Sequence, residues 1–221
     1  MNKYDVIIIG AGPSGIFCAY ELMRQKPDMK VLMIEKGRSI EKRQCPKRTT
    51  KVCVGCKPCS ITTGFAGAGA FSDGKLSLSP DVGGTLPEIL GYEKAEELIK
   101  EADNIYLKFG ADEKVYGIDD YEAIERIRAK AIRANLKLIE CPIRHLGTEE
   151  GYKIYTRLQE HLLASGVEIK FMTMVQDIII EDGVAKGVVT DKEETYYADE
   201  IVSGIGREGS SWFEGICKNH G

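Results

Sequence analysis

The sequence predicts a mixed α/β fold, in which a parallel sheet is extended by an antiparallel β-meander and interrupted by a helical insertion. Three observations lead to this prediction. Residues 4–35 alternate between strand-like, helix-like and strand-like patterns, residues 87–135 have helical periodicity, and residues 175–203 have the two-residue period of short strands. With 221 residues the chain is long enough for one such domain with a modest insertion.

The composition is that of a soluble globular protein. The chain has 30 basic and 34 acidic residues, a net charge of -4, and 43% hydrophobic residues. This balance argues against a globally basic nucleic-acid binder, and no apolar run approaches the roughly 20 residues of a membrane span. Asp5 and the early glycines interrupt the apolar block that a signal peptide requires. We therefore expect a cytoplasmic protein with neither a nucleic-acid partner nor a membrane span.

The N-terminal elements form a strand–helix–strand unit. Residues 4–9 are a β-branched run typical of a strand buried on both faces. A helical pattern runs from Ser14 to about Lys26 and is ended by Pro27. Residues 30–35 are a second predicted strand, parallel to the first.

The later elements are separated from this unit by an irregular stretch. Residues 37–84 are rich in glycine, cysteine, serine and lysine, and so long a stretch without periodicity is usually functional. Helices are predicted over 87–108, 119–135 and 151–165, and strands over 167–171, 175–180, 184–190, 195–197 and 201–203.

The turn after the first strand carries the spacing Gly10-X-Gly12-X-X-Gly15. In this pattern the first glycine allows a tight turn, the second lets the backbone approach a pyrophosphate, and the third allows close helix-to-strand packing. The helix start attracts phosphates, and Glu35, 20 residues after Gly15, is placed to accept hydrogen bonds from ribose hydroxyls. We therefore predict a Rossmann-like dinucleotide-binding domain, in which the Glu35 carboxylate disfavours NADP.

Four of the seven cysteines, Cys45, Cys53, Cys56 and Cys59, fall within 15 residues. Without export signals, clustered thiols indicate metal, iron–sulfur or redox chemistry rather than disulfides. The last three can hold a zinc ion or three corners of an iron–sulfur cluster, with Cys45 as the fourth ligand. A redox thiol pair and a loop without a specific role are the alternatives.

Charge is uneven in the same region. Between residues 36 and 59 there are eight basic residues and one acid, Glu41, and such a block can neutralise phosphates, lower thiol pKa values or be a solvated basic loop. Farther along the chain, His145 follows Arg144 and can act as an acid–base group or contact a phosphate, although an isolated histidine is usually structural. Neither observation identifies a catalytic acid or base.

Several segments resemble a known family. The early glycine turn, the continuation from Glu35 to Arg38 and the three-strand meander together resemble the glutathione-reductase-type flavoprotein fold. More narrowly, residues 64–76 (GFAGAGAFSDGKL), 144–148 and 204–209 resemble the bacterial and archaeal FAD-dependent (NAD(FAD)-utilising) dehydrogenase family. Ala66 stands where that pattern leads us to expect a glycine.

The resemblance implies an oxidoreductase that transfers hydride or electrons through bound FAD, with an unknown small-molecule substrate and possible use of NAD(P)H as electron donor. The residues that it implies at FAD, from the ADP half to the pyrophosphate and the flavin, are Gly10, Gly12, Pro13, Ser14, Gly15, Glu35, Lys36, Arg38, Val175, Gly204, Gly206, Arg207, Gly67, Ala68, Gly69 and Gly74. The rival hypotheses are a non-catalytic module that binds a dinucleotide and a metal or cluster, and a dehydrogenase that uses NAD alone.

The domain organisation follows from the same patterns. We expect residues 1–84 to begin the FAD-binding domain with its cysteine-rich loop, residues 85–145 to form a helical cap, and residues 146–221 to continue the domain. Related flavoproteins close their site with a C-terminal Gly-Asp motif, and no Gly-Asp dipeptide occurs in this sequence. The chain is therefore expected to be an N-terminal fragment, and its oligomeric state stays open.

Overall fold

The computed structural model describes residues 3–72 and 74–220. The chain divides into two compact units, one formed by Met1–Phe71 with Tyr155–Gly221 and the other by Ser72–Ile154. Each unit has its own sheet. The predicted limits of the inserted cap, residues 85 and 145, lie inside the second unit and stay a prediction.

The first unit is built on a six-stranded sheet in the order β6-β2-β1-β9-β8-β7. Strand β1 pairs in parallel with β2 and β9, and β2 pairs in parallel with β6, whereas β7, β8 and β9 pair antiparallel. The predicted parallel sheet with an antiparallel meander is therefore confirmed. The strands are β1 (Lys3–Ile9), β2 (Val31–Glu35), β6 (Glu168–Phe171), β7 (Val175–Glu181), β8 (Val184–Thr190) and β9 (Thr195–Ser203).

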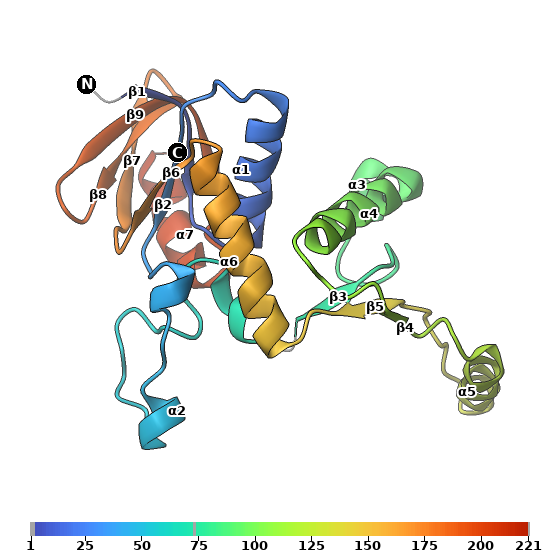
Figure 1. Cartoon of the computed structure of the whole chain (residues 1–221). Helices are drawn as coiled ribbons and strands as arrows, with labels where there is room; N and C mark the ends of the chain where they lie inside the picture. The colour runs from blue at the N-terminus through green and yellow to red at the C-terminus, as the bar shows by residue number, and fades with distance from the viewer. Residues whose placement is uncertain (1–2, 73, 221) are drawn as a thin grey trace. The chain divides into compact units, whose positions relative to one another are not determined.

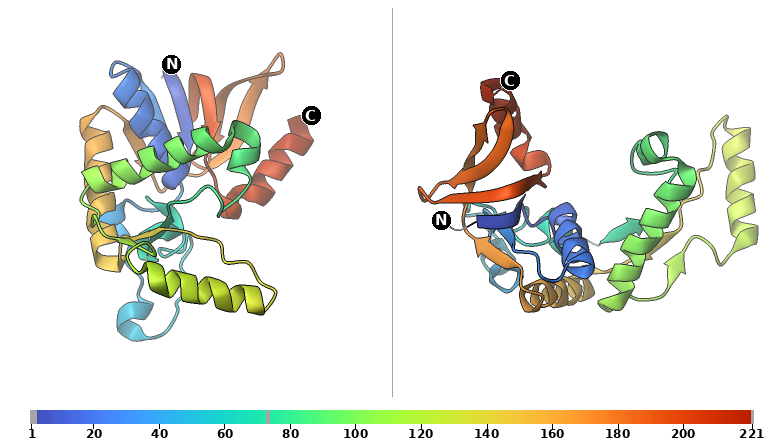
Figure 2. Two further views of the ribbon diagram at one scale, coloured as in Figure 1. Left: turned by 90° about the vertical axis from the view of Figure 1, so that its right-hand side faces the viewer. Right: turned by 90° about the horizontal axis from the view of Figure 1, so that it is seen from above.

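The runs Val6–Ile9 of β1 and Val31–Ile34 of β2 are apolar on both faces because both faces of the sheet are covered there. Ile7 and Ile9 of β1 belong to a core cluster with the meander and with Ile216 of α7 (Ser210–His220). On the opposite face, a Cβ built on Gly15 of α1 (Pro13–Gln25) would lie 3.2 Å from Ile8 Cγ2. Helix α6 (Thr148–Ala164) lies beside α1 (Figures 1 and 2), where the rings of Tyr20 and His161 are 5.4 Å apart.

Two sequence predictions in this unit need correction. Strands were expected at 195–197 and 201–203, but β9 is continuous and pairs with β1 in parallel from Tyr197 to Ser203. Asp199 and Glu200 lie between the two predicted strands and are exposed, so their polar side chains are compatible with a continuous strand. Helix α7 was not expected at all.

Among the residues that the structure describes, the second unit contains the sheet β3-β5-β4, the helices α3, α4 and α5, and the start of α6. Its elements are β3 (Lys75–Ser77), α3 (Leu86–Leu90), α4 (Tyr92–Lys108), β4 (Val115–Tyr116), α5 (Tyr121–Arg133) and β5 (Ile143–His145). The prediction of one helix over 87–108 is wrong, because Gly91 has φ +85° and separates α3 from α4. The small sheet was not expected in the helical cap.

The irregular stretch between β2 and β3 is only partly ordered into regular structure. It contains two short 3-10 helices, η1 (Ile40–Lys42) and η2 (Gly67–Phe71), and the single-turn helix α2 (Lys47–Thr50). Ile40, Arg43 and residues 63–66 are buried, whereas residues 46–57 are exposed. None of the helices formed by the described residues combines the length and apolarity that crossing a membrane requires.

Candidate functional site

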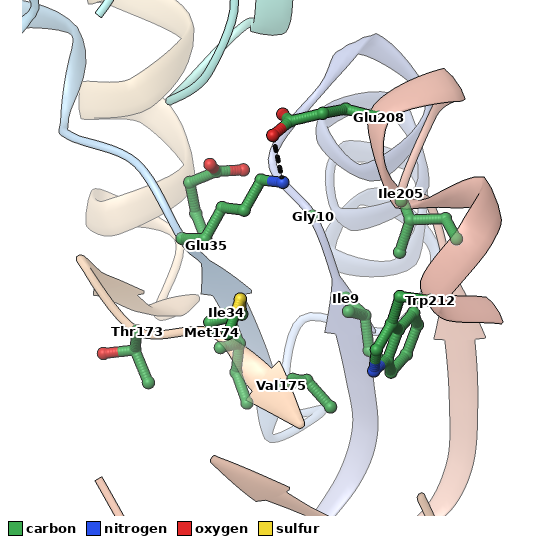
Figure 3. Close-up of a pocket in the computed structure, with 12 residues that line it drawn as sticks. Ile9, Gly10, Ile34, Glu35, Thr173, Met174, Val175, Ile205, Glu208 and Trp212 are labelled. Carbon is green, nitrogen blue, oxygen red and sulfur yellow. Dashed lines mark ion pairs between the residues drawn. The ribbon is translucent and has the colours of Figure 1, made fainter. Parts of the chain in front are cut away.

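Two adjoining cavities lie where β1, β2 and β9 end. The first, of about 250 Å³, is largely apolar, and Figure 3 shows Ile9, Ile34, Val175 and Trp212 around it. The second, of about 490 Å³, is lined by the start of α1, by Thr62–Gly64 and Gly67–Ala68, and by the turn after β9. The two cavities share five lining residues: Gly10, Glu35, Lys36, Ile205 and Glu208. They therefore form one groove.

The glycine turn forms the floor of this groove. Gly10 has φ +97°, and a Cβ there would lie 2.7 Å from the Gly204 carbonyl oxygen. A Cβ on Gly15 would lie 2.1 Å from the Gly10 carbonyl oxygen. A Cβ on Gly12 would have no atom within 4 Å. Gly10 and Gly15 are thus required by the packing of the protein itself, whereas Gly12 faces the groove.

The start of α1 is suited to an anion. Gly12 caps the helix without a side-chain hydrogen bond, Pro13 occupies its first turn, and that turn has no acidic residue. The N–H groups of a first helical turn have no partner within the helix and carry positive partial charge. A phosphate group in the larger cavity would therefore meet favourable electrostatics at Gly12 to Ser14.

Glu35 braces the turn from the end of β2. Its side chain is buried, and its two carboxylate oxygens accept hydrogen bonds from Ala11 N at 2.8 Å and Gly37 N at 2.7 Å. An ionised carboxylate has about four lone-pair sites, so acceptor capacity remains for a ligand hydroxyl. The ribose-binding role of Glu35 stays a prediction, and the brace is a second role that sequence reasoning missed.

The glycine-rich loop after the cysteines is anchored by Arg43, which is 3% exposed. Its guanidinium donates hydrogen bonds to four carbonyl oxygens: Ser60 (3.0 Å), Ile61 (2.7 Å), Phe65 (2.5 Å) and Gly67 (2.7 Å). Burial lowers the pKa of Arg43 to about 10, which still leaves it charged at neutral pH. In the sequence, Arg43 is one of eight basic residues between 36 and 59, and no local pattern indicates its anchoring role.

The same loop contacts the glycine turn through its backbone. Ala66 N donates to the Ala11 carbonyl oxygen at 2.7 Å, and Ala66 itself is fully buried. Its φ of +69° is the left-handed conformation that favours glycine. This explains why a glycine was expected at this position, and it shows that alanine is accommodated there.

Glu208 bridges two walls of the groove. Its carboxylate lies 2.7 Å from Lys36 Nζ and accepts a hydrogen bond from Thr63 Oγ1 at 2.9 Å. The contact with Lys36, which has the larger effect, and the hydrogen bond from Thr63 hold the pKa of Glu208 below its usual range. The ion pair is drawn as a dashed line in Figure 3.

The cysteine loop is organised differently. Cys53, Cys56 and Cys59 are exposed, Cys45 is partly buried, and all are free thiols. Among the residues that the structure describes, no group of three or more cysteine, histidine or acidic side chains is arranged to hold a metal ion. The structure therefore does not bring the four predicted ligands together.

Cys59 differs from its neighbours. The backbone N–H groups of Ile61 and Thr62 lower the pKa of its thiol, with further contributions from the Thr62 hydroxyl and the Arg43 charge. Cys59 lies three residues before Thr62, which lines the larger cavity. These contacts favour the thiolate form of Cys59, close to the wall of the larger cavity.

Most of the predicted cofactor residues meet at the groove. Twelve line it: Gly10, Gly12, Pro13, Ser14, Glu35, Lys36, Gly67, Ala68, Val175, Gly204, Gly206 and Arg207. Gly15 packs beneath the turn, while Arg38 and Gly69 are not among the lining residues. Gly74 belongs to the second unit, where its carbonyl oxygen accepts a bond from Leu146 N at 2.8 Å. Asp73, within the same motif, lies outside the described residues.

The Arg144–His145 motif is also in the second unit. Arg144 is buried and forms a two-pronged ion pair with Asp103 of α4, at 2.5 and 2.8 Å. The ring of His145 packs against Tyr116, with centroids 5.0 Å apart. These contacts give both residues a structural role within their unit.

Several groove residues were missed because no spacing rule points to them. The strand ends, the start of the meander and α7 supply walls of the apolar cavity through residues that belong to no motif: Ile9, Ile34, Thr173, Met174 and Trp212. Glu208 lies inside the segment 204–209 that carries the family resemblance, and Thr63 directly precedes the segment 64–76. The sequence does offer one signal for Glu208: it is an acidic residue in a segment expected to lie near the pyrophosphate, and its negative charge would repel a phosphate.

Comparison with known proteins shows which family the sequence resembles. A family model described as FAD dependent oxidoreductase (DAO) matches residues 5–207. Thiamine thiazole synthase from Coprinopsis cinerea is 52% identical over 33 residues, which are 15% of this chain and 10% of that protein. The chain thus matches only a short segment of this curated relative.

Solved structures share the fold at low sequence identity. Glycine oxidase from Bacillus cereus ATCC 14579 has a TM-score of 0.51 and 17% identity, with 90% of this chain and 54% of that chain covered. L-proline dehydrogenase from P. horikoshii has a TM-score of 0.53 and 15% identity, with 98% and 56% covered. The chain therefore spans little more than half the length of these two proteins.

Proposed function

We propose that this chain, which belongs to the FAD dependent oxidoreductase family, forms the cofactor-binding part of an enzyme that exchanges a hydride between a small organic molecule and FAD. The observation that carries the proposal is the single groove formed by two cavities at the ends of β1, β2 and β9. Ligands of open α/β sheets bind at this edge.

The residues fit the ADP half of FAD. Ile9, Ile34 and Val175 offer an apolar slot for adenine, and the remaining acceptor capacity of Glu35 suits ribose hydroxyls. Gly12 has space above its Cα, and the start of α1 suits the pyrophosphate, with Gly204, Gly206 and Arg207 on the facing wall. The negative charge of Glu35 disfavours a 2′-phosphate on this ribose.

The residues at the flavin end of FAD are proposed from the family resemblance and from the position of Gly67 and Ala68 in the larger cavity. Gly67 and Ala68 line the larger cavity and belong to the loop that Arg43 holds, and Gly69 and Gly74 continue that motif. Bound FAD would supply a two-electron acceptor for hydride. The chain's own contribution is to hold and orient the dinucleotide, because no described groove residue is identified as an acid or base for the reaction.

Finer features remain proposals. NAD(P)H as electron donor, and zinc or an iron–sulfur cluster at Cys45, Cys53, Cys56 and Cys59, have no support in the contacts of the described residues, and a cluster would require the loop to rearrange. A cytoplasmic location is supported by seven free cysteines, since thiols persist in reducing compartments.

The proposal is tested by binding FAD and ADP to Gly12→Asp, with Gly215→Asp as a matched control. Both glycines have an open Cβ position, but only Gly12 faces the groove. A carboxylate at position 12 would repel the pyrophosphate, so we expect both affinities to fall at least about tenfold, the equivalent of about 1.4 kcal/mol. The control should bind within about twofold of wild type. Equal affinities in all three proteins would refute the proposed site.

A further inference from the structure

The ion pair between Lys36 and Glu208 has an unusual position for a cofactor groove. Lys36 directly follows β2, and Glu208 lies in the 3-10 helix η3 (Arg207–Gly209) after β9. Strand β1 lies between β2 and β9 in the sheet and ends at Ile9, directly before Gly10. The pair therefore joins the two strands that flank the glycine turn.

Both partners line both cavities. A ligand that places one part in the apolar cavity and another at the start of α1 must pass Lys36 and Glu208. Thr63 Oγ1 is the third member of this contact and comes from the wall of the larger cavity. Glu208 thus accepts from two donors, Lys36 Nζ and Thr63 Oγ1, at the boundary that the two cavities share.

Because of the charges that line the groove, the contact between Lys36 and Glu208 affects the binding of an anionic ligand. Its ionisable lining residues are two acids, Glu35 and Glu208, and two bases, Lys36 and Arg207. Glu35 already accepts two backbone hydrogen bonds, whereas Glu208 neutralises Lys36. A pyrophosphate carries negative charge, so Glu208 repels it and also competes for the ammonium group of Lys36.

We propose that Glu208 is an affinity-setting residue, which weakens the binding of the anionic dinucleotide by competing for Lys36. This inference rests on the proposed function of the groove. The Glu208 side chain is 58% exposed and that of Lys36 is 32% exposed, so their ion pair is of the kind that contributes little and exchanges partners readily. Lys36 can therefore transfer from the carboxylate to a phosphate without opening the fold.

The test is ADP binding by titration calorimetry to the whole chain and to Glu208→Gln. Glutamine keeps an acceptor for Thr63 but removes the charge, so we expect ADP to bind about three- to fivefold tighter. The affinity of the variant should also fall more steeply with added salt, because a freed Lys36 then contacts phosphate. Glu214→Gln is the matched control, since Glu214 pairs with Lys218 on α7 away from the groove and its loss changes net charge equally.

A double-variant cycle separates competition for Lys36 from simple repulsion. In a Lys36→Gln background, we expect Glu208→Gln to change the ADP affinity less than about twofold. Unchanged or weaker ADP binding by Glu208→Gln alone would overturn the inference while leaving the groove intact. Absence of ADP binding in wild type and all variants would instead overturn the proposed function, and this inference with it.

Discussion

The glycine turn at residues 9–15 and the cysteine loop at residues 45–59 are held in opposite ways. The turn is fixed by backbone contacts to three neighbours: Gly10 N to Ile34 O at 2.8 Å, Gly204 N to Ile9 O at 2.8 Å, and Ala66 N to Ala11 O at 2.7 Å. In the loop, every residue from 46 to 57 is exposed, and its hydrogen bonds are local. The glycine turn, which the sheet supports, is therefore the segment that can hold a ligand in a precise geometry.

This difference shows what a cluster in the sequence can and cannot imply. Four nearby thiols indicate metal chemistry only if something brings them together, and no described contact does so in the cysteine loop. Gly10 and Gly15 need no added ligand to take their positions, because the backbone of the neighbouring segments already packs against them. Each of the following predictions tests one side of this contrast.

The largest effect is expected for Gly15→Ala. A Cβ at position 15 would lie 2.1 Å from the Gly10 carbonyl oxygen, so helix α1 must shift away from β1. We expect the free energy of unfolding to fall by about 3 kcal/mol or more, measured in urea. Gly12→Ala is the control, and its open position should limit the loss to about 0.5 kcal/mol. Similar losses in both variants would contradict the packing described for the turn.

Replacement of Arg43 comes next. Arg43→Met removes a buried charge that holds four carbonyl oxygens of the glycine-rich loop, and we expect a loss of about 2 kcal/mol. The guanidinium groups of Arg43 and Arg48 both lie over the Phe71 ring, at 4.8 and 5.0 Å from its centroid, but Arg48 is exposed, so Arg48→Met is the control. The control should unfold within about 0.5 kcal/mol of wild type. Equal stability of the two variants would show that the loop does not depend on this anchor.

The reactivity of Cys59 provides a kinetic test. Only the thiolate reacts with iodoacetamide, and hydrogen bonds from Ile61 and Thr62 lower the pKa of Cys59. The alkylation rate of Cys59 should therefore reach half of its maximum at a lower pH in the folded protein than in the urea-unfolded chain. Mass spectrometry of peptides over a pH series measures both rates. Coincident pH profiles would rule out a special environment for Cys59.

The smallest effect is expected for the double variant Cys53→Ser with Cys56→Ser. Both thiols are exposed and free, so the free energy of unfolding should change by less than about 0.5 kcal/mol. Metal analysis of the same preparations should give equal metal content in wild type and variant. A loss of stability above about 2 kcal/mol, together with loss of bound metal, would establish that a metal organises this loop.

The sequence by itself determined the strand–glycine turn–helix unit, the parallel pairing of β1 with β2 and the antiparallel meander, because periodicity and glycine spacing are local properties of the chain. It also indicated most groove residues near the turn. The tertiary structure alone decided that Arg43 anchors the glycine-rich loop and that α7 supplies Trp212 to the apolar cavity. It also decided that Glu208 meets Lys36 across β1. These contacts join residues far apart in the chain, and a local pattern carries no information about which distant side chains will meet.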